Sequence, residues 1–270
     1  MIAFRQISLQ DGVVATVPVD LELVEATNSP VPLHQRHALI SLRWRERYMQ
    51  RVPEPYRAFF RFALPHLRAR TTDVHTATST EFVPELLAGE RMSVNETVVY
   101  AALILHDSGW SRVSEPEIVA SLAGRDVRHS DAPKQEPHDI FGAAIARQIL
   151  PASPLADQLG PEGRRFVEEL VAHHTWGDRY RPQGRHIVEM DLLCDADRLW
   201  SYTRENFWQD IVRKRVAVRA YIEGIERAIP AYFVTATGKT IAHRLWLERS
   251  KEVSVYDSYS STKVILDKNS

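Results

Sequence analysis

Residues 98–110 read VVYAALILHDSGW, and this stretch places a histidine and an aspartate at the end of an apolar run. The run from Val98 to Leu105 contains no charged residue and belongs to a segment whose pattern predicts an apolar helix. A buried carboxylate such as that of Asp107 is costly unless charge or hydrogen bonds compensate it. A metal ion would supply that charge, and His106 beside it is a residue type that binds metals. The stretch therefore raises the expectation of further ligands elsewhere in the chain.

The composition is that of an ordinary globular protein, with 270 residues, 44% hydrophobic and 26% charged, and a formal net charge of −1. That charge gives no global basic field to attract long nucleic acid or an anionic membrane surface. The one cysteine, Cys194, excludes an internal disulfide framework and fits a reducing compartment. No secretory signal and no apolar run of membrane-spanning length is found. We expect a soluble cytoplasmic protein.

The spacing of apolar residues predicts a mostly α fold with a small N-terminal extension for which β structure is expected. Residues 2–24 alternate loosely around Asp11-Gly12, a hairpin turn signal, and the pattern becomes helical from His37 onward. We expect an N-terminal extension over 1–35, a helical domain over 36–252 with its core at about 70–230, and a poorly ordered polar tail over 253–270. The longest loop is expected at 124–137. Helical segments are expected at about 36–50, 54–69, 72–88, 94–107, 115–123, 138–150, 162–176, 187–204, 206–229 and 237–251.

Histidines and aspartates recur at or near the inward edge of five of these segments. His138 shares a helical face with Phe141 and Ile145, and the adjacent His173 and His174 both follow buried-type residues at helical spacing. Any one of them alone is more often a satisfied core or boundary residue than a ligand. Together they need partners, and the simplest common partner is a cation. The series consists of His75, His106-Asp107, His138, His173-His174, and Asp195 with Asp197.

This ordered series resembles the HD superfamily of metal-dependent phosphohydrolases, whose helical core carries the pattern H…HD…D, with further histidines in members that hold two metals. The stretch DADRL at 195–199 resembles the segment of the last ligand, and the likeness covers roughly 70–250. The resemblance implies an HD-domain-like helical bundle in which His75, His106, Asp107 and Asp197 bind a first metal. It implies that His138 and one or both of His173 and His174 bind a second, with Asp107 as the bridge. Asp107 and Asp197 would be the catalytic carboxylates, and Asp195 would orient a ligand.

The chain also departs from the family pattern. Many members read HDxGK, whereas Trp110 stands here where that lysine would be, and the first acidic residue downstream is Glu115. The general acid is therefore unassigned. Arg198, Trp110 and Trp176 lie beside the ligand segments and are candidates for substrate contacts, although surface pairing of the arginine and core packing of the tryptophans are equally compatible with the sequence.

The resemblance implies hydrolysis of a nucleotide or another small phosphate ester through a metal-bound hydroxide, with one or two divalent ions of Mn, Fe, Co, Ni or Zn. A second reading is a di-iron oxygenase of the same superfamily, which would cleave a C–C or C–P bond. A third is a nucleotide-binding module without catalysis. The expected partner is a small phosphorylated substrate, with no long nucleic acid and no membrane, and a homodimer is left open.

Overall fold

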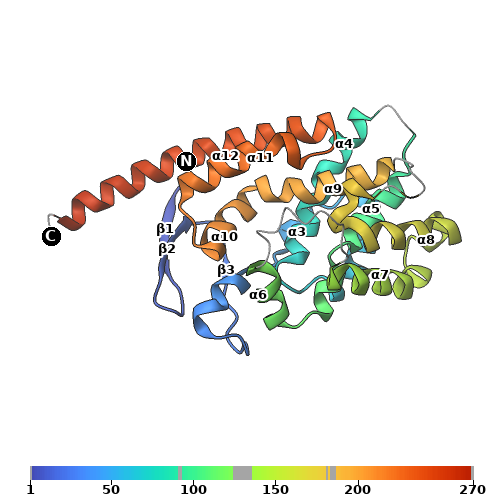
Figure 1. The fold of residues 1–270 in the computed structure, drawn as a ribbon, viewed down its shortest axis with the longest axis horizontal. Coiled ribbons are helices and arrows are strands. Elements are labelled where there is room, and N and C mark those ends of the chain that lie inside the picture. Colours follow the sequence, from blue (N-terminus) through green and yellow to red (C-terminus); the bar gives the residue numbers. More distant parts are fainter. Residues whose placement is uncertain (1, 91–92, 124–135, 181, 183–186, 269–270) are drawn as a thin grey trace.

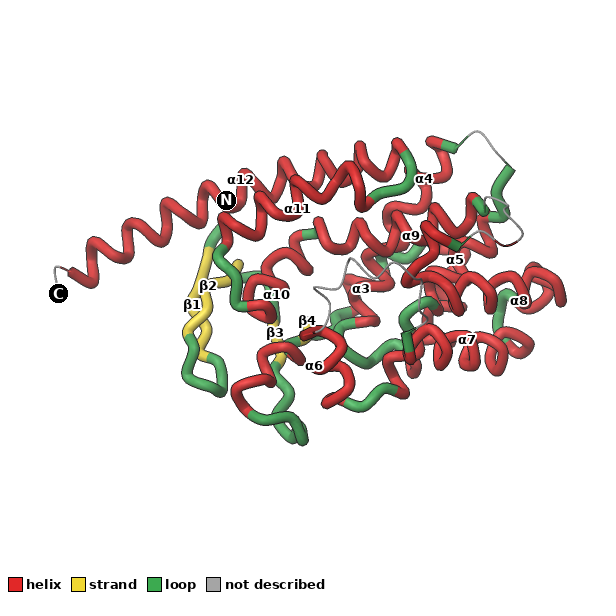
Figure 2. Tube along the Cα trace, in the orientation of Figure 1, coloured by secondary structure: helices red, strands yellow, loops and turns green. Residues whose placement is uncertain are grey.

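The computed structural model describes residues 2–90, 93–123, 136–180, 182 and 187–268 of the chain. Within this part, helices dominate and strands occur only near the N-terminus (Figure 2). This confirms the expected mostly α class with a small β extension. The α-helices are α1 (Glu46–Met49), α2 (Arg57–Ala63), α3 (Thr72–Ser79), α4 (Val83–Gly89), α5 (Glu96–Leu105), α6 (Glu115–Ala123), α7 (Pro137–Ile149), α8 (Ala156–His173), α9 (Val188–Leu199), α10 (Arg204–Lys214), α11 (Val218–Tyr232) and α12 (Ala236–Lys268).

The N-terminal residues form the expected hairpin. Strand β1 (Phe4–Ser8) pairs antiparallel with β2 (Val14–Pro18), and Gly12 takes a φ of +83° in the turn, a conformation that glycine adopts without a Cβ clash. A second pair joins β3 (Leu23–Val24) to β4 (Ser41–Leu42). The hairpin is not separate from the helical body, because Phe4 packs edge-to-face on Trp208 with ring centroids 5.0 Å apart.

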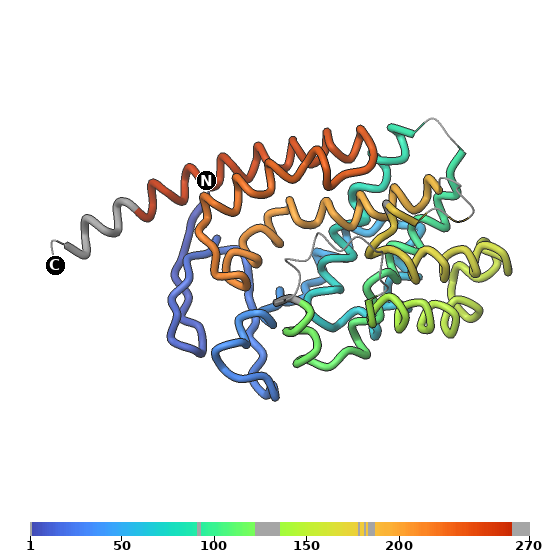
Figure 3. The backbone as a smooth tube through the Cα atoms, viewed as in Figure 1, coloured from blue at the N-terminus to red at the C-terminus, as the bar shows by residue number. Residues whose placement is uncertain are grey.

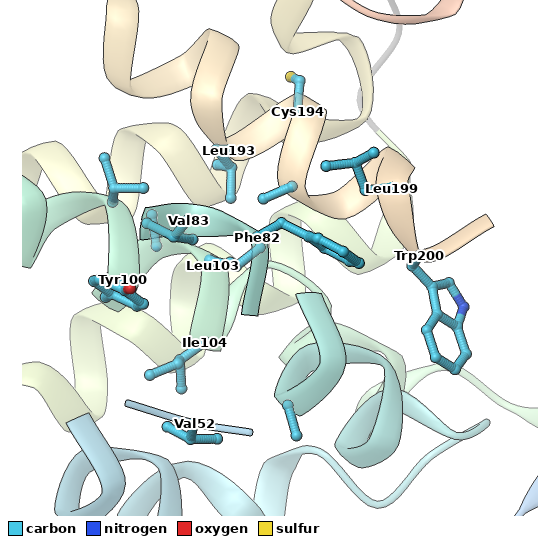
Figure 4. Close-up of a cluster of buried hydrophobic side chains, with 14 of the residues drawn as sticks. Val52, Phe82, Val83, Tyr100, Leu103, Ile104, Leu193, Cys194, Leu199 and Trp200 are labelled. Carbon is cyan, nitrogen blue, oxygen red and sulfur yellow. The ribbon is translucent and has the colours of Figure 1, made fainter. Parts of the chain in front are cut away.

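Helix α5 runs through the centre of the core, and residues Val98 to Leu105 are all buried, as the apolar run predicts. The Asn95 side chain caps its N-terminus by accepting a hydrogen bond from the Val98 backbone. A buried leucine such as Leu103 contributes about 1.5–3 kcal/mol through its removal from water. Side chains of α4, α5 and α9, with Phe82 just before α4, belong to this core (Figure 4), namely Phe82, Val83, Tyr100, Leu103, Ile104, Leu193, Cys194 and Leu199.

Helices α7 and α8 pack against α5 at one end of the molecule, while α11 and α12 lie side by side along another edge (Figure 1). Following the chain colours, segments from the first third of the sequence lie beside α9 (Figure 3). The described helices include none that combines the length and apolar character needed to cross a membrane.

Several expected element bounds differ from the structure; for example, the segment expected as one helix over 72–88 forms α3 and α4 with a 3₁₀ turn between them. Residues 206–229 form two helices because Arg215 adopts a left-handed φ of 52° that ends α10. The expected helix over 36–50 is replaced by a 3₁₀ helix, η1 (Leu33–Leu39), the short strand β4 and α1. The stretch after Val253, expected as a poorly ordered tail, continues α12 as far as Lys268. The expected loop over 124–137 lies almost entirely outside the described residues.

Candidate metal centre

The end of α5 presents His106 and Asp107 to the centre of the protein. The Nδ1 atom of His106 lies 2.7 Å from the Leu103 carbonyl oxygen. A carbonyl can only accept, so Nδ1 carries the proton and Nε2 carries a lone pair. That Nε2 atom is buried and has no hydrogen-bond partner. Its lone pair is thus available to a cation, which is the usual arrangement of a metal-binding histidine.

The first set of donors, here the outer group, comprises His75 from α3, His106, and Asp197 from α9. The Oδ1 atom of Asp197 lies 2.9 Å from Nε2 of His75 and 3.3 Å from Nε2 of His106. The His75 ring is stacked on Trp200 at a centroid distance of 5.2 Å. One donor atom of each residue lies within 4.8 Å of the others. The outer group could therefore hold a metal ion.

The second set, the inner group, comprises His138 and Asp139 at the start of α7 and His174 just after α8. The Oδ1 atom of Asp139 lies 3.3 Å from Nε2 of His138 and 3.2 Å from Nδ1 of His174. Nδ1 of His174 also lies 2.8 Å from the Val171 carbonyl oxygen, which leaves Nε2 as the atom that can bind a cation once it carries no proton. The Thr175 hydroxyl donates to Asp139 Oδ1 across 2.7 Å.

Asp107 stands between the two groups and turns one oxygen to each. Its Oδ2 atom lies 3.2 Å from Nδ1 of His75 and 3.7 Å from Nε2 of His106, on the outer side. Its Oδ1 atom lies 3.6 Å from Nε2 of His138 and 3.5 Å from Nε2 of His174, on the inner side. A carboxylate in this position can contribute one oxygen to each of two neighbouring cations.

The charges of the centre are strongly coupled. Burial lowers the pKa of His75, but its contacts with Asp107 and Asp197 outweigh this and raise it to about 9. Burial likewise lowers the pKa of His174, whereas Asp139 and Asp107 raise it to about 9. Burial raises the pKa of Asp107, but the neighbouring histidines hold it well below its usual range. Without a cation, protons on the imidazoles therefore balance the carboxylates.

Two of the three outer side chains are more exposed than the inner ones, while His106 is fully buried. The side chain of Asp197 is 30% exposed and that of His75 is 12% exposed, whereas His138, Asp139 and His174 are at most 4% exposed. The centre thus opens on the side of the outer group. The inner group is enclosed by α7, α8 and the 3₁₀ helix η7 (His174–Arg179).

The structure brings together six of the seven residues expected as metal ligands and leaves out His173. Its ring stacks on Tyr180 with centroids 4.0 Å apart. Among the described residues, it belongs to neither the outer group nor the inner group. Helix α8 ends at His173 and η7 begins at His174. Adjacent residues of a helix point in directions about 100° apart, so only one of the two can face the centre.

Of the two aspartates in DADRL, Asp197 lies among the possible metal donors and Asp195 does not. Asp195 was expected to orient a ligand, but its carboxylate instead accepts hydrogen bonds from the backbone of Val234 and Thr235, each at 2.8 Å, and from the Thr235 hydroxyl. Burial raises its pKa above the ordinary value, while these donors oppose the rise. Asp195 therefore anchors the start of α12 rather than the histidines.

The three residues expected to contact substrate all have contacts within the protein. Arg198 donates to the Tyr232 carbonyl oxygen across 2.7 Å, which links α9 to α11. Trp176 is half-buried, and the guanidinium of Arg179 lies 5.2 Å from its ring centroid. Trp110 is only 3% exposed and packs on the inner group. These contacts give the three side chains roles within the fold, and their contact with a substrate stays a prediction.

Asp139 is the residue that the sequence reasoning missed. It is almost fully buried and touches both inner histidines, and its Oδ2 atom accepts from the Glu136 backbone across 2.9 Å. The available signal was its place directly after His138, in the first turn of a helix where an aspartate also serves as a cap. A capping role and a role at the centre are indistinguishable in the sequence.

Comparison of this chain with protein-family models, with curated proteins and with solved structures gave no match. The arrangement of the His and Asp residues is therefore what bears on function.

Proposed function

We propose that this protein is a metal-dependent phosphohydrolase, similar to the HD superfamily, that acts on a nucleotide or another small phosphate ester. The observation that carries the proposal is the placement of Asp107, whose Oδ2 atom faces the outer group and whose Oδ1 atom faces the inner group. The ordered His and Asp residues that resemble the family converge around it. The donor set of imidazole nitrogens and carboxylate oxygens suits divalent transition metals.

A bound divalent cation would lower the pKa of a water molecule and neutralise charge that develops on phosphoryl oxygens. The chain's own residues prepare this chemistry. His75, His106, Asp107 and Asp197 would hold a cation at the opening, and His138, His174 and Asp107 would hold one further inside. Asp107 and Asp197 are both kept ionised, since burial raises the pKa of each but the histidines lower it further.

The position of the opening supports a small substrate. A phosphate ester would approach past Asp197 and His75, the more exposed side chains of the outer group. Carboxylates alone would repel such an anion, so binding depends on the cation that they hold. The net charge of −1 offers no general attraction for a long polyanion.

The test combines metal content with turnover. Protein purified without added metal is assayed by elemental analysis, and phosphate release is then measured with p-nitrophenyl phosphate and nucleoside monophosphates in the presence of Mn, Co, Ni or Mg. We expect release that Asp107→Asn abolishes and that the control His173→Ala retains. Equal release by wild type and Asp107→Asn, or no release with any ion, would contradict the proposal. Iron content with oxygen uptake and no phosphate release would favour the oxygenase reading.

A further inference from the structure

The indole of Trp110 contacts a residue on each side of the inner half of the centre. Its Nε1 atom donates to Oδ1 of Asp107 across 3.0 Å. Its ring lies parallel to that of His138, with centroids 4.1 Å apart and an interplanar angle of 13°. One side chain therefore sets both the rotation of the Asp107 carboxylate and the plane of the His138 imidazole.

The backbone fixes this side chain relative to α7. Trp110 lies in the 3₁₀ helix η5 (Ser108–Arg112), directly after Gly109. A Cβ atom at Gly109 would lie 1.9 Å from the His138 carbonyl oxygen and 2.5 Å from the Gly142 nitrogen. The two backbones are thus in direct contact, and no side chain between them can adjust the position of the indole.

The face of the indole opposite His138 is covered by Arg70, whose guanidinium lies 4.2 Å from the ring centroid. Because His138 occupies one face at a similar distance, Arg70 must lie on the other. Arg70 and Thr71 both have positive φ, 57° and 82°, which residues with a Cβ rarely adopt. A cation over an indole is attracted to its π face and draws electron density from it, which strengthens the N–H as a donor.

Hydrogen bonds maintain this unusual turn. The Thr71 hydroxyl oxygen accepts from the Leu42 backbone across 2.9 Å and from the Gln209 side chain across 2.8 Å. Helix α3, which carries His75, starts directly after it. Strain of this kind persists only where surrounding contacts enforce it. The turn that places His75 in the outer group therefore also closes Trp110 over the inner group.

We propose that Trp110 is a positioning residue for the inner group, and that its hydrogen bond to Asp107 Oδ1 determines how tightly the centre holds a second ion. The proposal rests on the proposed metal function. Oδ1 is the oxygen that faces His138 and His174, while Oδ2 faces the outer group. Loss of the indole N–H frees the carboxylate to rotate, which disturbs the inner donors first. A residue that hydrogen-bonds to a metal ligand without binding the metal itself typically contributes about 10–100-fold to metal affinity.

The experiment titrates the metal-stripped full chain with Mn²⁺ and follows free ion by electron paramagnetic resonance, together with the spectrum of coupled ion pairs. The test variant is Trp110→Phe, which keeps an aromatic ring over His138 and removes only the N–H donor. The matched control is Trp200→Phe, because Trp200 stacks on His75 of the outer group. His174→Ala, which lacks an inner donor, identifies the inner binding step.

We expect Trp110→Phe to weaken the inner step by about tenfold or more and to lose the coupled-pair signal, with the outer step unchanged. Trp200→Phe should leave the inner step intact. Unchanged inner affinity in Trp110→Phe would overturn the inference while leaving the proposed function standing. Equal weakening of both steps, with a lower melting temperature in the presence of EDTA, would also overturn it, since this indicates a general structural role. Wild type that binds no Mn²⁺ would overturn the proposed metal centre itself.

Discussion

The outer and inner groups use the same kinds of donor but differ in what surrounds them. The Asp197 side chain at the opening is 30% exposed, whereas Asp139 in the inner group is 1% exposed and accepts hydrogen bonds from Thr175 and the Glu136 backbone. In the outer group His106 is held by a hydrogen bond to the Leu103 carbonyl, whereas in the inner group both Asp139 and His174 are held by such bonds to the surrounding protein. The inner half is thus preorganised by the fold, and the outer half has access to solvent and substrate.

Replacement of the residue shared by both halves should have the largest effect. Asp107→Asn keeps the side-chain volume but removes the charge that faces both groups, so both ions should be lost. We expect activity to fall by about a thousandfold or more, since several kcal/mol of transition-state stabilisation depend on the metal. Phosphate release and metal content, measured on the same preparation, check this result. Retention of either ion would show that Asp107 does not join the halves.

The adjacent histidines offer a matched pair that separates the inner half from its surroundings. His174→Ala removes an inner donor and should abolish the second binding step, with a loss of about 100-fold or more in metal affinity. His173→Ala removes a ring that stacks on Tyr180 and should leave metal binding unchanged. Metal titration of both variants distinguishes them. The reverse order of effects would place the wrong histidine in the centre.

Asp139→Asn tests whether the inner half is preorganised by its hydrogen bonds. The change keeps the shape but weakens the interactions of Asp139 with His174 and with the Thr175 hydroxyl. We expect about a 10–100-fold loss of affinity at the inner step and little change at the outer step. Titration followed by electron paramagnetic resonance resolves the two. Equal losses at both steps would indicate that the halves are not independently held.

The last two predictions concern pH, and the effect on metal binding should be similar in both halves, because each contains one histidine whose pKa is raised to about 9. Metal binding must displace these protons, so affinity should rise about tenfold per pH unit for each step between about 6.5 and 9. Isothermal titration at several pH values measures this slope. A slope confined to one step would show that only one imidazole is protonated in the metal-free protein.

Stability of the metal-free protein should change in the opposite direction. The folded pKa of His75 lies above the unfolded value of 6.5, so its contribution to stability is fully present below pH 6.5 and is lost as pH rises through about 9. Thermal melting in the presence of EDTA should therefore show a decline across this window. Added metal should offset the decline.

Periodicity predicted which segments carry the centre, but not every residue that faces it. Residues 98–107 were readily identified because a long apolar run has few alternatives to burial. In α7 the expected inward face included Phe141, which is 37% exposed, while the small residues Gly142 and Ala143 are buried beside His138. Small residues face the core here because α7 packs closely on η5, a close approach that hydrophobicity does not reveal.

The remaining errors share a physical origin in helix ends. The distinction between His173 and His174 depends on where α8 changes to a 3₁₀ helix, and both follow buried residues at the same spacing. The break after α10 depends on a left-handed conformation at Arg215, a residue type that carries no signal for it. Tertiary contacts determine where both helices end, so the local sequence pattern could not predict either end.

The anchoring of α12 by Asp195 has a consequence for any shortened form of this protein. Gly238 lies so close to Asp195 that a Cβ on this glycine would be 2.3 Å from Oδ2 of Asp195. Asp197, a residue of the outer group, lies two residues after Asp195 on α9. Deleting the last helix together with the Val234 and Thr235 that precede it would strip this buried carboxylate of its donors and uncover the side of α9 that packs on α12. Trimming the chain after Tyr232 should thus damage the reactive centre although the deleted residues contribute no ligand, and fusion partners are better attached beyond the far end of the helix.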